Sequence, residues 1–71
     1  MPLDFRSATA WRRWLERNHD RSDGEWLYLY KKGGSRAGLR YPEALDEALC
    51  FGWIDSQSRR VDENRMIQWF S

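Results

Sequence analysis

Residues Tyr41 to Ser56 read YPEALDEALCFGWIDS, and this stretch predicts a short helix that stops abruptly and continues as a strand. Pro42 suits the first helical position, because its missing N–H would have no partner there. Four apolar residues are spaced to form one helix face: Ala44, Leu45, Ala48 and Leu49. Gly52 suits the left-handed position that ends many helices. We therefore expect extended chain to begin at Trp53.

A bulky apolar stripe predicts an earlier helix, at about Ala8 to Asn18. Trp11, Trp14 and Leu15 follow helical spacing on one face of it. Ser7 has the side chain of a good N-cap. A polar segment that ends in glycine follows, and it predicts a loop before the next element.

The clearest strand is residues 25–31, which read EWLYLYK. Aromatic residues on one face alternate with leucines on the other: Trp26, Tyr28 and Tyr30 against Leu27 and Leu29. Both faces are therefore apolar or amphipathic, and we expect cover on each of them.

Two more strands are expected after the second helix, at 53–61 and 65–70, and they form a candidate hairpin. The fold class is then α+β, in the order helix-strand-helix-strand-strand, with a three-stranded sheet and two helices on one face. Placing the third strand between the first two makes every neighbour antiparallel and the crossover right-handed. A simple 1-2-3 order is the alternative.

The bulk composition limits what this chain can be. Its 71 residues make a single small domain, at 1–71. With 12 Lys and Arg against 11 Asp and Glu, the net charge gives no reason to expect nucleic acid or a membrane surface. The opening residues lack a signal peptide, so we expect a cytoplasmic protein. One cysteine excludes an internal disulfide and a Cys-based zinc site, and we expect Cys50 to be a small buried hydrophobe.

Aromatic residues are unusually frequent, with five Trp, three Tyr and three Phe. A domain of this size hides only about 60% of its unfolded surface, so some rings should lie at an interface. We expect a ligand or partner surface formed by Trp53, Asp55, Ser56, Trp26, Tyr28, Tyr30 and Trp69. The alternatives are that most of these rings form the core, and that the others dock a further part of the same protein.

The segment between the first strand and the second helix predicts a possible anion site. Four cations fall within ten residues, together with three glycines and no acid: Lys31, Lys32, Arg36 and Arg40. Such a loop can hold phosphate through backbone N–H groups and charge. It lacks the Gly-Lys-Ser/Thr ending of a P-loop, and a solvated connecting loop is the alternative. Beside Arg59, Arg60 and Arg65, aromatic rings on a sheet could also stack bases.

Two residues were weighed as catalytic candidates. Asp55 follows the Gly52 turn and could act with Asp46 or Glu47 in acid–base or metal chemistry; pairing with Arg59 or with backbone groups is the simpler interpretation. His19 is the only imidazole, and its position at a helix end favours capping of a carbonyl. We assign no catalytic residue, no metal ligand and no cofactor.

Several segments together resemble the opening of bacterial proteins of the YdeI/OmpD-associated (bacteriocin-protection, OmdA-like) family. They are residues 11–19 (WRRWLERNH), 25–27 (EWL), 30–32 (YKK), 41–56, 61–63 (VDE) and 68–71 (QWFS). The resemblance runs from about Trp11 to Ser71 and is strongest over 41–56. Because members of that family are longer, it implies that residues 1–71 are an N-terminal part. It assigns no reaction and no catalytic residue.

We therefore expect a non-enzymatic module that binds a protein partner or a small ligand through its aromatic surface. The family resemblance suggests a link to stress or antimicrobial-peptide resistance. Expected partners are another protein, a further C-terminal region of the same chain, or a second copy, with no membrane and with nucleic acid less favoured. The alternative function is binding of nucleic acid or a phosphate ligand by the basic Gly-rich loop and the hairpin.

Overall fold

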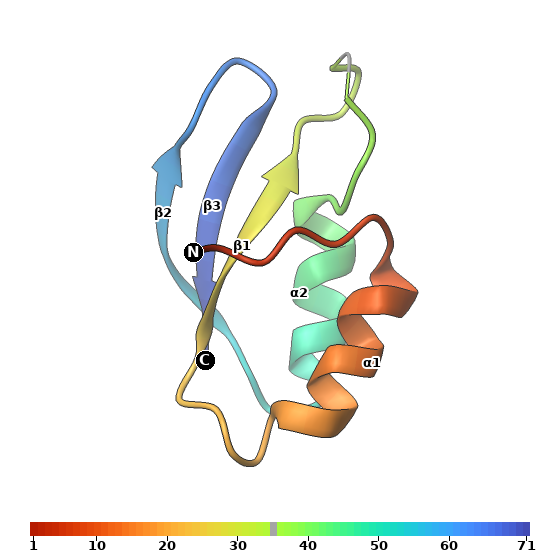
Figure 1. The fold of residues 1–71 in the computed structure, drawn as a ribbon, viewed down its shortest axis with the longest axis vertical. Coiled ribbons are helices and arrows are strands. Elements are labelled where there is room, and N and C mark those ends of the chain that lie inside the picture. The colour runs from red at the N-terminus through yellow and green to blue at the C-terminus, as the bar shows by residue number, and fades with distance from the viewer. Residues whose placement is uncertain (35) are drawn as a thin grey trace.

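Two helices and three strands follow one another in the expected order (Figure 1). The computed structural model describes residues 1–34 and 36–71. The elements are α1 (Ala8–Asn18), β1 (Glu25–Tyr30), α2 (Tyr41–Leu49), β2 (Asp55–Arg60) and β3 (Arg65–Phe70). The α+β class and the order of elements are confirmed.

The three strands form one antiparallel sheet in the order β1-β3-β2. This is the order that puts the third strand between the first two, and the simple 1-2-3 order is excluded. Tyr28 pairs with Ile67, and Arg59 pairs with the same Ile67 from the other side. A register shift lies between Asp55 and Ser58 of β2, so the chain carries a β-bulge there.

The N-terminus of α1 and the C-terminus of α2 are capped by the expected residues, whereas α2 begins at Tyr41, with Arg40 as its N-cap and Pro42 as its second residue rather than its first. The Ser7 side chain accepts a hydrogen bond from the Ala10 N–H, at 3.2 Å, which caps the N-terminus of α1. After α2, Gly52 has φ of 77° and its N–H donates to the Leu49 carbonyl, while the Trp53 N–H donates to Ala48. This pair of bonds is the Schellman pattern, in which only glycine takes the left-handed position without strain.

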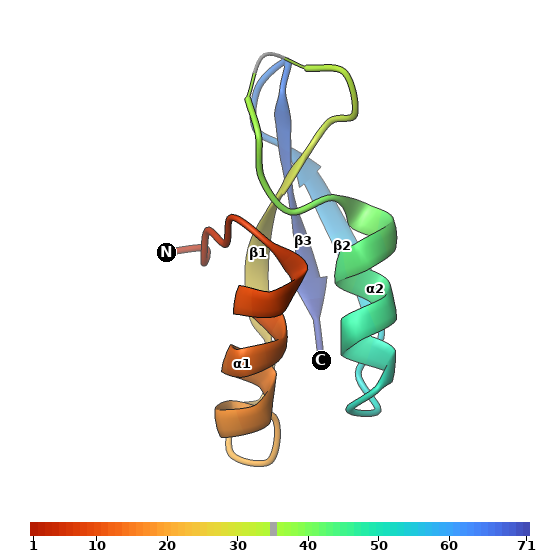
Figure 2. The same cartoon turned by 90° about the vertical axis from the view of Figure 1, so that its right-hand side faces the viewer.

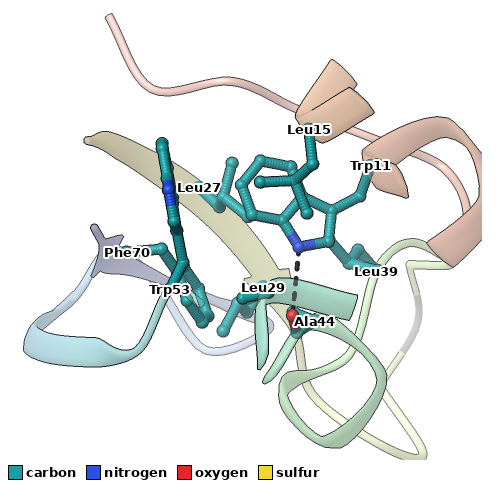
Figure 3. Close-up of a cluster of buried hydrophobic side chains, with 9 residues drawn as sticks. Trp11, Leu15, Leu27, Leu29, Leu39, Ala44, Trp53 and Phe70 are labelled. Atoms are coloured by element: carbon teal, nitrogen blue, oxygen red, sulfur yellow. Dashed lines mark hydrogen bonds between the residues drawn. The ribbon is translucent and has the colours of Figure 1, made fainter. Parts of the chain in front are cut away.

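Both helices cover one face of the sheet, with α1 and α2 side by side across it (Figure 2). The core lies between them and the sheet, and it is built on Trp11, which is fully buried (Figure 3). Its indole N–H donates to the Ala44 carbonyl of α2 at 3.0 Å. The other core residues are Leu15, Leu27, Leu29, Leu39, Ala44, Ala48, Trp53 and Phe70.

Three expectations for residues 41–61 were wrong in detail. Leu49, expected on the apolar face of the helix, is 51% exposed, and Cys50, expected to be a small buried hydrophobe, is also exposed. The reason is that α2 packs through its small residues, Ala44 and Ala48, which leaves only a narrow buried face. The strand begins at Asp55 rather than at Trp53, because Trp53 first has to turn back into the core after the Gly52 cap.

Candidate functional site

An open groove of about 1230 Å³ lies where the basic loop (residues 31–40), the start of α2 and the β2–β3 turn meet. The basic loop is held at both ends: the Lys31 N–H donates to the Asn64 carbonyl at 2.9 Å, and the Tyr30 N–H donates to Leu39 at 2.7 Å. The loop and the turn therefore lie side by side at the upper end of the sheet (Figure 1). Ser35, within this loop, lies outside the described residues.

The side chains around this groove are mainly cationic. Among the described residues, eight cations line it: Arg6, Lys31, Lys32, Arg36, Arg40, Arg59, Arg60 and Arg65. Four carboxylates accompany them: Glu43, Asp46, Asp62 and Glu63. The groove thus carries a formal excess of four positive charges, whereas the whole chain carries +1. The charges outside the groove must sum to −3, so positive charge is concentrated here.

Within the described part of the chain, Arg65 is the one groove cation that forms an ion pair. Its Nη2 lies 3.0 Å from Asp62 Oδ2. Asp62 also accepts backbone N–H bonds from Asn64 and Arg65, at 2.8 and 2.9 Å, and the Asn64 bond is the main cause that lowers the pKa of Asp62. Arg60 makes a long bond of 3.4 Å to the Asp62 carbonyl. The remaining cations are available to a ligand.

Tyr30 ties the basic loop to the end of β1. Its ring is 7% exposed, and its hydroxyl donates to the Asp4 carboxylate at 2.8 Å. Burial, followed by this hydrogen bond, raises the pKa of Tyr30. Gly38 lies against the ring so closely that a Cβ there would collide with it. The Arg36 guanidinium lies 5.7 Å from the ring centroid, so a cation–π contact with Tyr30 helps to position this groove cation.

Both helices lie on one face of the sheet, and neither covers the other, outer face (Figure 2). The outer face carries half-buried rings with arginines over them. Trp26 and Trp69 pair edge to face, with centroids 5.5 Å apart. The Arg59 guanidinium lies 5.9 Å from the centroid of Trp26, and that of Arg65 lies 4.7 Å from the centroid of Tyr28. Because both arginines also line the groove, this face and the groove adjoin each other.

The expected aromatic surface is only partly present. Trp53 is 6% exposed and packs edge to face on Trp11 and Trp14, so it belongs to the core and not to a surface. Tyr30 is also buried. Of the eleven rings, four are buried, six are half-buried, and Tyr41 alone is exposed, at 38%. The excess of rings is therefore absorbed mostly by packing.

Asp55 is half-buried and accepts a hydrogen bond of 2.6 Å from the Tyr41 hydroxyl. This bond is the main cause that raises the pKa of Tyr41. The expected pairing of Asp55 with Arg59 is absent among the described residues, and Glu47 is engaged instead with Arg12, at 2.8 Å. Ser56 is exposed. The structure thus gives Asp55 a structural partner that sequence reasoning missed.

His19 lies at the end of α1, where its Nδ1 is 2.7 Å from the Leu15 carbonyl. Since a carbonyl only accepts, Nδ1 carries the proton, and the expected capping role is confirmed. No group of three or more potential metal ligands occurs among residues 1–34 and 36–71. Neither helix in that part has the length and apolar character to cross a bilayer.

Sequence reasoning missed several members of the groove, among them Arg6 and Tyr41. Arg6 comes from the N-terminal segment, and Tyr41 opens α2. Nothing in the spacing of the sequence links them to residues 31–40 or to the hairpin. The one available signal is the absence of acids between Lys31 and Arg40. It identifies the basic loop as a candidate site but does not identify the residues that the fold places beside the loop.

Comparisons with known proteins add a family. A family model described as "Domain of unknown function (DUF8412)" matches residues 3–71. No curated protein and no solved structure matches the chain. The resemblance to the YdeI/OmpD-associated family stays a prediction.

Proposed function

Because the chain belongs to the DUF8412 family, whose function is unknown, we propose a function from its groove: a non-enzymatic domain that binds a phosphate-bearing ligand. The observation that carries this proposal is the concentration of positive charge, eight cations against four acids around one groove. A groove lined by one sign of charge raises the local concentration of the opposite ion and its rate of association.

The arrangement of these cations supports an anion with two or more oxygens, such as phosphate. Six of the eight are arginines, whose planar forks bind two phosphate oxygens at once. The two lysines, Lys31 and Lys32, come from the loop opposite the hairpin arginines, so a ligand in the groove would meet cations from both sides. To bind phosphate, the Arg65 guanidinium has to leave the Asp62 carboxylate. This competition limits the affinity of the groove for phosphate.

The test is a titration of the ¹⁵N-labelled chain with inorganic tripolyphosphate at low salt. We expect chemical-shift changes in residues 31–40 and 59–66. Raising the salt from about 50 to about 200 mM should weaken binding steeply, because phosphate contacts by Lys and Arg release counterions. Shift changes confined to other residues, or affinity that ignores salt, would contradict the proposal.

A matched pair of charge reversals sharpens this test. The double variant Lys32→Glu/Arg36→Glu changes two exposed groove cations, and Arg13→Glu/Arg17→Glu changes two exposed cations of α1 outside the groove. Both variants alter the net charge equally. The groove variant should lose at least about tenfold in affinity and the α1 variant much less. Equal losses would mean that only net charge matters.

The aromatic outer face supports a second candidate function, which is binding of a protein partner or a small apolar ligand. Trp26, Tyr28 and Trp69 are half-buried on a sheet face that neither helix covers. The partner is another protein, a second copy, or a further region of the same chain in a bacterial, cytoplasmic protein. Light scattering and binding of a hydrophobic dye test this candidate, and a monomer that binds no dye would argue against it.

A further inference from the structure

We propose that the ligand of the groove is a single strand of nucleic acid, whose phosphates lie along the groove cations and whose bases stack on the outer face of the sheet. This inference rests on the proposed function and adds the chemical class of the ligand. It follows from the way in which two arginines join the groove to the aromatic rings.

Arg59 and Arg65 belong to both regions. Both line the groove, and their guanidinium groups lie over Trp26 and Tyr28, at 5.9 and 4.7 Å from the ring centroids. Each guanidinium covers part of the ring face that a base would use, so Arg59 and Arg65 have to swing off the rings and onto the adjoining phosphates when the bases stack. A ligand made only of phosphates would contact the cations and not the rings.

The rings are spaced along one strand in a way that suits successive bases. Trp26 and Tyr28 are two residues apart on β1, which places them roughly 6.6 Å apart along the same face. Trp69, the partner of Trp26 in the register, extends the platform onto β3. Stacking on sheet aromatics is a common way for proteins to hold unpaired bases, because every base has a π-face.

The same features disfavour a duplex. Base faces are hidden inside a double helix, so the rings of Trp26 and Tyr28 would have nothing to stack on. Both helices lie on one face of the sheet (Figure 2). Trp26 and Tyr28 alternate with the buried leucines and so lie on the other face, from which neither helix can enter a DNA groove. A single strand exposes its phosphates and its base faces together, and it therefore satisfies both regions.

Fluorescence anisotropy with labelled strands of about 12 nucleotides tests this inference. This length lies within the range of about 4–16 nucleotides that a small single-strand-binding domain covers. Four probes are compared on the whole 71-residue chain: oligothymidine DNA, oligouridine RNA, an abasic strand with the same number of phosphates, and a duplex. The two base-bearing strands should bind at least about tenfold more tightly than the abasic strand. The difference between DNA and RNA then identifies the natural source.

The matched variants are Trp26→Val/Tyr28→Val, which removes the platform but keeps strand-favouring side chains, and Phe51→Val. Phe51 is also half-buried, but it packs against His19 and lies outside the groove. The platform variant should bind the base-bearing and abasic strands equally, and Phe51→Val should keep the difference. Near-UV circular dichroism checks that both variants are folded. If the platform variant is unfolded, the wild-type comparison of base-bearing with abasic strands decides alone.

The other outcomes separate the two proposals. Equal affinity of the wild-type chain for abasic and base-bearing strands would overturn this inference and leave phosphate binding in place. A duplex that binds as tightly as a single strand would also overturn it. Failure of every strand and of tripolyphosphate to bind would overturn the proposed function as well.

Discussion

Strands β1 and β2 are both six residues long and both pair with β3, yet their surroundings are opposite. In β1, three residues are buried and the other three half-buried. In β2, no residue is buried and five are exposed. β1 is therefore stabilised by packing under the helices, and β2 mainly by its hydrogen bonds to β3.

The change in burial can be followed across the sheet along each row of paired residues. Leu27 and Ser58 both pair with Gln68, from opposite sides, so the three residues form one row. Leu27 is fully buried, Gln68 is 5% exposed, and Ser58 is exposed. The next row runs from Tyr28 through Ile67 to Arg59. Apolar side chains on β1 thus give way to polar and cationic ones on β2, which supplies two of the eight groove cations, Arg59 and Arg60.

The largest effect is expected from removing a buried side chain on the covered strand. Leu27→Ala should cost about 2–5 kcal/mol of unfolding free energy, out of a total of about 4–10 kcal/mol for a chain of this length. Ser58→Ala, in the same row, should stay within about 0.5 kcal/mol. Urea unfolding followed by tryptophan fluorescence measures both. Equal losses of unfolding free energy in the two variants would contradict the claim that packing stabilises β1 far more than β2.

A smaller effect is expected where the basic loop crosses the end of β1. In Gly38→Ala the new Cβ would collide with the buried ring of Tyr30, and this overpacking should cost about 1–3 kcal/mol. Anion affinity should fall with it, because the loop would be displaced. The exposed neighbour offers the control: Ala37→Ser should leave stability and binding unchanged. A stable Gly38→Ala variant would mean that the loop does not depend on Tyr30.

On the uncovered side, a substitution should improve binding rather than stability. Asp62→Asn removes the carboxylate that competes for Arg65, while the amide oxygen can still accept the Asn64 and Arg65 N–H bonds of the turn. Affinity for tripolyphosphate should rise by a factor on the order of three, since one repulsive charge is lost. Isothermal titration calorimetry measures the change. A weaker complex would show that Asp62 supports the site.

The smallest effect is expected from acid. Hydrogen bonding to Arg12 lowers the pKa of Glu47, and the Asn64 N–H lowers that of Asp62. Both carboxylates are therefore stabilising above their ordinary pKa values of 4.5 and 3.8, and this contribution is lost as the pH falls through the lower folded-state values. The Tm should drop more between pH 6 and pH 3 in the wild type than in Glu47→Gln. If the Tm of both proteins falls equally with pH, the Glu47 carboxylate does not contribute to the loss of stability in acid.

The two regions also differ in how far the sequence predicts them. β1 alternates rings and leucines, and this pattern is enough to identify a strand and its two faces. β2 reads DSQSRR and has little strand propensity. It is expected as a strand because extended chain should follow the Gly52 stop, and residues 65–70 offer it a hairpin partner. In the candidate site, the loop cations could be identified from their clustering, but Arg6 and Tyr41 could not, because only the fold brings them near.

By itself, the sequence determined the elements and most of their ends, because capping and periodicity are local properties. Ser7 and Gly52 act through neighbours within a few residues, and the alternation of rings and leucines marks the two faces of β1 as expected. The tertiary structure decided which apolar side chains are buried. Trp53 lies in the core and Cys50 is exposed, because α2 packs through its alanines. It also decided that the basic loop and the hairpin share one groove, since contacts between distant segments depend on how the strands pair.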